Sequence, residues 1–322
     1  MPINSTFGAA AKRGFAGAGS SGIEVDIVIN ATTNLGTTLD HTAVNTGGSL
    51  ETYFSAMQFG INTGLSPRKL KNSNEFDRVG DGILRFTIPM GTYGWQGRSG
   101  SGSGSTHWTG MAASGTMIFG SNTDVMLLVP NNGRGNYSGG GALFLCTGST
   151  MSSPSGVILV IGGGGGGYGA AISAGQVGPF QSSQGAASSR RGGGNAINYD
   201  GGAGLFNSYT PETYSGSSYE AQRARHFVEG GKGGNVSACQ SGDGGGFGGG
   251  GGGCPAGGGG FVGGIRGGDS PQQGGGGGTS YYNPTYIPSE PTVIQTSISV
   301  AGNLDGFRSA EAGFFKLWTL TA

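Results

Sequence analysis

Short stretches in the first half of the chain alternate apolar and polar residues. The clearest is IEVDIVIN, residues 23–30, whose period of two is typical of a strand with one buried face. Further segments with strand-like composition are 53–60, 83–89, 115–120, 124–130, 142–148, 156–162, 292–300 and 313–322. Turns rich in Gly, Asn and Pro separate them. We therefore expect an antiparallel sandwich or jelly roll.

From residue 156 to 278, apolar residues alternate instead with runs of glycine. The apolar segment 157–161 leads directly into six glycines at 162–167, and Phe247, Cys254 and Phe261 interrupt the glycine tract from 242 to 278. A flexible Gly/Ser linker needs no such bulky residues. We interpret them as anchors into a core, and the glycine as ordered. Collagen is excluded, because it needs glycine at every third position together with much proline.

The remaining ordered arrangement is a bundle of polyglycine II helices. This helix has about three residues per turn and a rise near 3.1 Å, so six glycines would span about 19 Å. It has no internal hydrogen bonds, but backbones without Cβ atoms can approach closely enough to pair every N–H and C=O between neighbours. The chain has 75 glycines among 322 residues. We predict that such a bundle is inserted into a mostly β fold.

Four regions follow from these patterns. Residues 1–22 form an N-terminal arm or docking peptide, 23–155 the β-sandwich, 156–280 the polyglycine bundle with inserts, and 281–322 the C-terminal strands that return to the sandwich. A weak helical pattern covers residues 217–230, where Tyr219, Arg223 and Phe227 recur every four residues. Little α-helix is therefore expected.

Charge and hydropathy narrow the range of partners. The chain has 17 basic and 17 acidic residues and a formal net charge of zero, which gives no electrostatic reason to bind nucleic acid. Its longest apolar runs, about six residues, are too short to cross a bilayer, and the start of the chain shows no secretory signal. We expect neither nucleic-acid binding nor membrane insertion.

The motifs of common enzyme and metal sites are missing. The Gly-Lys pair at 231–232 is followed by glycine rather than Ser or Thr, so it does not match the phosphate-binding loop. His41, His107 and His226 lie far apart in the sequence, and none sits in a zinc motif. The sequence predicts a protein that is not an enzyme and has no cofactor and no metal.

The three cysteines leave one question open. Cys239 and Cys254 are close enough in sequence to form a disulfide in an oxidising setting, and the sequence does not decide whether they do. Cys146 lies in the apolar run ALFLCTG and is expected to be a buried thiol.

Aromatic residues supply the candidate contacts with partners. Tyrosine is enriched at recognition surfaces, so the candidate surface comprises Tyr209, Tyr214, Tyr219, Tyr281, Tyr282 and Tyr286. The alternative is that these tyrosines cap the ends of the bundle. Candidate docking residues of the arm are Phe7, Lys12, Arg13 and Phe15.

Six segments between residues 80 and 285 carry a resemblance to a known family, through both their sequences and their order along the chain. They are FTIPMGTYGWQGRSGSGSGS (86–105), SGGGALFLC (138–146), GVILVIGGGGGGYGA (156–170), GGAGLF (201–206), FVEGGKGGNVSACQ (227–240) and GGGFGGGGGGCPAGGGGFVGG (244–264). This order resembles the extracellular glycine-rich region of the anaplastic lymphoma kinase and leukocyte tyrosine kinase receptors and of related microbial proteins. The last segment is the most specific.

The resemblance implies a sandwich like that of tumour necrosis factor, with long polyglycine helices packed in a bundle, and a part in binding a protein ligand. Receptor signalling does not carry over, because this sequence shows no membrane span and no kinase. Bundles of similar appearance also occur in adhesins at the tips of bacteriophage tail fibres, where loops between the glycine helices contact the host.

These observations lead to one expected function and two alternatives. We expect a virion protein of a bacteriophage, a homo-oligomer in a tail fibre or another surface component. It would contact other virion subunits, and the inserts at 170–191 and 205–226 are candidates for binding a host receptor. The first alternative is a subunit of an extracellular filament or surface layer. The second is a ligand-binding glycine-rich module.

Overall fold

The fold is described from a computed structural model. It describes residues 24–30, 58–59, 77–80, 83–88, 90–104, 106–133, 137–148, 154–166, 177–182, 201–205, 224–231, 233–234, 244–252, 256–264, 274–296, 299–301 and 313–320. Nearly all its regular elements are strands. They are β1 (Glu24–Asn30), β2 (Gln58–Phe59), β3 (Asp77–Gly80), β4 (Ile83–Ile88), β5 (Gly91–Arg98), β6 (Thr106–Trp108), β7 (Ala112–Phe119), β8 (Thr123–Leu128), β9 (Leu143–Thr147), β10 (Gly156–Ile161), β11 (Phe180–Gln181), β12 (Ser280–Tyr282), β13 (Thr292–Gln295), β14 (Ser299–Ala301) and β15 (Phe314–Thr319).

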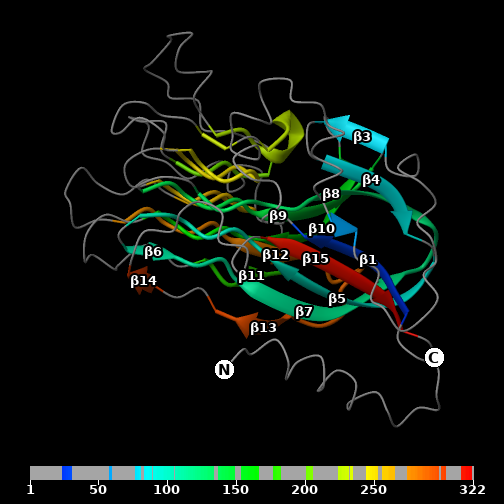
Figure 1. The fold of residues 1–322 in the computed structure, drawn as a ribbon. Coiled ribbons are helices and arrows are strands. Elements are labelled where there is room, and N and C mark those ends of the chain that lie inside the picture. Colours follow the sequence, from blue (N-terminus) through cyan, green and yellow to red (C-terminus); the bar gives the residue numbers. More distant parts are fainter. Residues whose placement is uncertain are drawn as a thin grey trace.

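Two large sheets form a sandwich (Figure 1). Sheet I has the strand order β13-β7-β5-β15-β1-β2, and sheet II has the order β11-β12-β10-β9-β8-β4-β3. Pairing is antiparallel except between β11 and β12, and β6 pairs with β14 in a separate two-stranded sheet. The predicted mostly β fold is confirmed.

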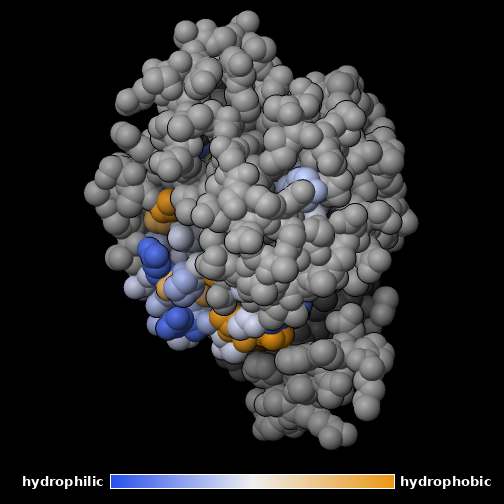
Figure 2. All heavy atoms as spheres, turned by 90° about the vertical axis from the view of Figure 1, so that its left-hand side faces the viewer, coloured by the Kyte–Doolittle hydropathy of each residue, from blue (hydrophilic) through white to orange (hydrophobic). Residues whose placement is uncertain are grey.

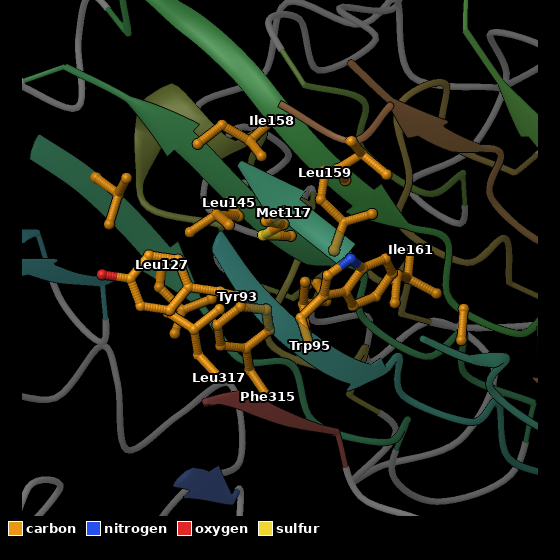
Figure 3. Packing of buried hydrophobic residues seen from close by; sticks show 14 of the residues in the cluster. Tyr93, Trp95, Met117, Leu127, Leu145, Ile158, Leu159, Ile161, Phe315 and Leu317 are labelled. Carbon is orange, nitrogen blue, oxygen red and sulfur yellow. The ribbon is translucent and has the colours of Figure 1, made fainter. Parts of the chain in front are cut away.

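Side chains from both sheets fill the space between them. Sheet I contributes Tyr93 and Trp95 from β5 and Phe315 and Leu317 from β15, which alternate along their strands (Figure 3). Sheet II contributes mainly aliphatic residues, among them Leu127, Leu145, Ile158, Leu159 and Ile161. These residues form one apolar core, and burying each large side chain contributes roughly 1.5–3 kcal/mol before conformational entropy is subtracted.

The centre of sheet II is buried on both faces. In β9, Leu143 and Leu145 belong to the core between the sheets, whereas Phe144 and Cys146 belong to a second apolar cluster on the opposite face. A strand buried on both faces needs apolar residues at consecutive positions. This explains why LFLCT and GVILVI are continuous apolar runs rather than alternating ones.

The last strand of the chain lies inside sheet I. β15 pairs with β5 on one side and with β1 on the other, so segments from the two ends of the sequence are neighbours. In Figure 1, β1 in blue lies beside β15 in red.

Strand β5 was missed by the sequence reasoning. Its sequence, GTYGWQGR, contains three glycines, which normally weaken a strand. At one of them the packing is tight, because a Cβ on Gly97 would come within 3.1 Å of Ile161 Cδ1 of the facing sheet. The predicted strand 292–300 is also divided, with β13 in sheet I and β14 paired with β6.

The weak helical pattern at 217–230 gives only a short 3-10 helix, η3 (Phe227–Glu229). It ends at Gly230, whose φ of 100° is accessible to glycine and rare for other residues. Residues 217–223 lie outside the described part of the chain, so the start of the pattern stays untested.

We predict that both faces of sheet II contribute to stability. Phe144→Ala and Leu145→Ala should each lower the free energy of unfolding by about 2–5 kcal/mol, because each leaves a cavity in a different cluster. Thr292→Ala, at an exposed position of the edge strand β13, should change it by less than about 0.5 kcal/mol. Urea unfolding measures all three. If Phe144→Ala were as mild as Thr292→Ala, the second cluster would not be packed.

Candidate functional site

The glycine-rich segments lie against one another and continue from the ends of the strands. We call this set the glycine array, and it comprises residues 99–104, 131–133, 137–142, 162–166, 201–205, 244–252, 256–264 and 274–279. Three of its segments are directly continuous with sheet II, since 137–142 leads into β9, 162–166 follows β10 and 274–279 leads into β12. Its members come from both the predicted sandwich region and the predicted bundle region.

Hydrogen bonds within the array repeat every three residues. Gly163 and Gly166 both donate their N–H to segment 256–260, and the carbonyls of the same two residues both accept from segment 274–279, at N···O distances of 2.8–2.9 Å. Between them, the N–H of Gly164 turns to a different segment and donates to Gly100 O at 3.0 Å.

The same repeat holds in segment 137–142. The backbone carbonyls of residues 137 and 140 accept hydrogen bonds from segment 256–260. Those of residues 138 and 141 accept from segment 99–104, and the N–H groups of residues 139 and 142 donate to segment 244–252. A helix with three residues per turn produces this repeat, whereas a β-strand returns to the same side every two residues. The pairing therefore fits the predicted polyglycine II bundle. The helical conformation of each segment stays a prediction.

Close backbone contact leaves no room for a side chain at many glycines of the array. A Cβ built on Gly165 would overlap the carbonyl of Gly275, and one on Gly258 would overlap the carbonyl of Gly163. Among the glycines of the array, a positive φ occurs at Gly104, Gly248 and Gly249, with φ of 127°, 103° and 80°. Elsewhere in the array, glycine is needed for close approach.

Serine and asparagine side chains complete the pairing where the chain is not pure glycine. Ser99, Ser101 and Ser103 alternate with glycine and are buried. Their hydroxyls accept hydrogen bonds from the backbone N–H groups of Met111, Gly110 and Ser138, at 3.0–3.1 Å. The side-chain oxygen of Asn132 accepts from Ser101 N–H at 2.8 Å. Sequence reasoning missed this role, although the regular Ser-Gly alternation could have indicated it.

Aromatic anchors hold the array onto the second face of sheet II. Phe247 and Phe261, predicted as anchors, are both buried in the second cluster. The ring of Phe261 stacks on that of Tyr281 from β12, with centroids 4.5 Å apart and an interplanar angle of 13°. Phe227 of η3 packs against Phe144 of β9 at 5.4 Å. Cys254, the third predicted anchor, lies outside the described residues.

The structure divides the candidate tyrosines. Tyr281 is buried at 2% exposure, which fits the alternative that it caps the bundle end rather than contacting a partner. Tyr282 and Tyr286 are partly buried and pack against the core between the sheets. Tyr286 O also accepts from Ile118 N–H at 2.8 Å, which joins this loop to sheet I. Tyr209, Tyr214 and Tyr219 lie outside the described residues.

The structure tests the predicted burial of Cys146, but not the predicted disulfide or the docking residues of the N-terminal arm. Cys146 is a free, buried cysteine, as predicted, and burial raises the pKa of its thiol far above the usual range. Cys239 lies outside the part of the chain that the structure describes, as does its proposed partner, so their disulfide stays untested. The docking residues Phe7, Lys12, Arg13 and Phe15 also fall outside it.

Charged groups are sparse near the array. The carboxylate of Glu229 lies 3.4 Å from His226 Nε2 and 3.8 Å from Arg225 Nη1, at the surface of η3. The described residues contain no group of three or more His, Cys, Asp or Glu side chains that could hold a metal ion. No helix within the described ranges is long and apolar enough to cross a membrane.

Exposed hydrophobic side chains are few in the described surface. The large ones are Met90, Ile118 and Val293. On the side of the molecule shown in Figure 2, small hydrophobic areas lie beside hydrophilic ones. The array is therefore the most distinctive feature of the described structure.

Comparisons with known proteins identify no family. No protein-family model matches the chain, and no curated protein matches its sequence. The resemblance to the glycine-rich receptor region therefore stays a prediction, and function has to be argued from the chain itself.

We predict that the array tolerates no side chain. Gly165→Ala should lower the free energy of unfolding by more than about 3 kcal/mol or prevent folding, because the added methyl group meets a backbone carbonyl that cannot move alone. Gly120→Ala is the matched control, since a Cβ there has nothing within 4 Å, and it should change stability by less than about 1 kcal/mol. Thermal or urea unfolding compares them. Equal stability of the two variants would mean that the glycine runs act as linkers.

We predict that Cys146 reacts only after unfolding. Its raised pKa keeps the thiol protonated in the folded protein, and burial blocks access. In a Cys239→Ser, Cys254→Ser background, iodoacetamide at pH 8.5 should label the protein in urea and leave the native protein unlabelled, as read by mass spectrometry. Rapid labelling of the native protein would contradict the burial.

The same burial predicts a pH dependence of stability. Because the Cys146 thiol ionises at lower pH in the unfolded chain than in the folded protein, the free energy of unfolding should fall as the pH rises above about 8.5.

Proposed function

We propose that this protein is a non-enzymatic structural and adhesion component of a bacteriophage virion, in a tail fibre or another surface position, and that it attaches the particle to a host receptor. In this proposal the chain acts as a homo-oligomer, and residues 1–22 dock it onto another virion subunit. The glycine array is the rigid support. The observation that carries the proposal is the backbone pairing at one end of the glycine array.

Four segments of the array, 137–142, 162–166, 256–264 and 274–279, are paired with one another around Gly166. Gly166 N–H donates to Ala256 O at 2.9 Å, Gly275 N–H donates to Gly166 O at 2.8 Å, and Ala256 N–H donates to Tyr137 O at 2.7 Å. Gly166 lies four residues past Gly162, whose N–H donates to Ser280 Oγ of β12, so this place lies beyond the end of β10. We call this place the array tip.

Backbone pairing holds these four segments at fixed spacing. A surface that is preorganised in this way loses less entropy when a partner binds. This arrangement supports attachment through the array tip more than through the tyrosines of β12.

The two inserts proposed for recognition differ in their described parts. In the first, 170–191, residues 180–181 form β11 of sheet II, where Phe180 packs near Tyr282 with ring centroids 6.3 Å apart. The described residues of the second, 205–226, include Leu205 and Ala224, and both are buried.

Tyr137 at the array tip is a candidate that sequence reasoning missed. Its φ is 85°, a positive value that no other non-glycine residue of the described chain has, and the residue is partly exposed. Bulky residues adopt such a conformation rarely and at a cost of about 1–3 kcal/mol, and such residues cluster at functional sites. Nothing in the sequence around Tyr137 signals this conformation.

Electron microscopy with gold-labelled antibodies tests the assignment. Antibodies raised against the purified protein should label the tails or surface of phage particles from the source culture. Label along continuous fibres that contain only this chain would overturn the virion proposal in favour of the filament. Label on neither structure would also overturn it.

We predict opposite effects of Tyr137→Gly on stability and attachment. Because glycine accepts a positive φ, the variant should keep its free energy of unfolding or gain up to about 1 kcal/mol. Removing the ring should lower adsorption of the particle to host cells at least tenfold. Tyr137→Phe is the matched control and should adsorb nearly normally. Normal adsorption of the glycine variant would exclude Tyr137 from the attachment site.

A further inference from the structure

Among the described strands, only β15 pairs β1 and β2 with the rest of sheet I. β1 pairs with β15 over six residue pairs, from Glu24 with Thr319 to Asn30 with Phe314. On its other side it pairs only with the two residues of β2, at the end of sheet I. Among the described strands, β2 has no partner except β1. β1 and β2 can therefore leave together by breaking one set of strand pairs, those with β15.

The chain segment that connects β2 to β3 is long. β2 ends at Phe59 and β3 begins at Asp77, and residues 60–76 could reach about 55 Å if extended. A compact chain of 322 residues has a radius of gyration near 20 Å and thus a diameter of about 50 Å. The connection is therefore long enough to place β1 against β15 of a neighbouring molecule.

Exchange between copies would preserve every contact. The β1–β15 hydrogen bonds are the same whether β1 comes from the same chain or from an identical one, which makes strand exchange a low-cost route to oligomers. What differs is the effective concentration of β1 at β15 within one chain, which is about millimolar for short connections and falls as the connection lengthens. Exchange becomes competitive when copies are held together at a similar local concentration, as in a multi-copy assembly.

We propose that β15 is an acceptor edge for β1 of a second copy, and that β1 and β2 are exchanged between neighbouring subunits of the homo-oligomer. The exchanged strand carries residues 1–22 with it, so the arm of one subunit is anchored on the body of the next. This proposal concerns assembly and is independent of whether the array tip binds a host.

Disulfide trapping tests the exchange. Val28 and Lys316 are direct register partners, and antiparallel partners have Cα atoms about 4.5–5.5 Å apart, within the range that a disulfide spans. Val28→Cys and Lys316→Cys would be placed in two separate chains with different tags and co-expressed in a Cys239→Ser, Cys254→Ser background. Val25→Cys with Lys316→Cys is the out-of-register control, since Val25 pairs with Trp318.

The expected result is a reducible dimer that contains both tagged chains, at least fivefold above the control, and that increases with protein concentration up to about 1 mM. A single chain carrying both Val28→Cys and Lys316→Cys should likewise give linked oligomers on a non-reducing gel. The proposal is overturned if that chain gives only an internally bonded monomer and the co-expressed pair gives no dimer above the control. It is equally overturned if neither arrangement forms a disulfide.

Discussion

The structure depends on one constraint, that buried backbone N–H and C=O groups must be paired. In the glycine array the partners are other backbones, which approach so closely that a Cβ at Gly165 or Gly258 would overlap a carbonyl. Glycine is therefore required by proximity at these positions, although it loses the most conformational entropy on folding. Where the sequence departs from glycine, the hydroxyls of Ser99, Ser101 and Ser103 accept the remaining hydrogen bonds.

Backbone pairing alone does not keep the array on the protein. The array provides few apolar side chains of its own, so its stability depends on the anchors Phe247 and Phe261, which lie in the cluster on the second face of sheet II. That second cluster in turn makes the strands β8–β10 apolar on both faces. The double burial of sheet II and the ordered glycine are thus two consequences of the same packing.

The same constraint restricts where function can reside. Most of the interior of the array is paired backbone with few side chains that a ligand could contact. For this reason the proposals concern the end of the array and the strands of the sandwich. At the array tip, Tyr137 combines a positive φ with partial exposure. Within sheet I, β15 pairs with β1 on one side and with β5 on the other. The proposed attachment site and the proposed site of assembly therefore involve different residues.

Local patterns in the sequence were sufficient to determine the mostly β fold, most of the strands, the buried Cys146 and the anchoring role of Phe247 and Phe261, because periodicity and apolar runs report burial directly. Tertiary structure alone decided that GTYGWQGR is a strand, that the Ser-Gly segment belongs to the array, that Tyr281 is buried, and that Tyr137 lies at the tip. Each of these depends on which backbone segments become neighbours. Pairs such as Gly100 with Gly164 are far apart in the sequence, and glycine has no side chain whose pattern could reveal its partner.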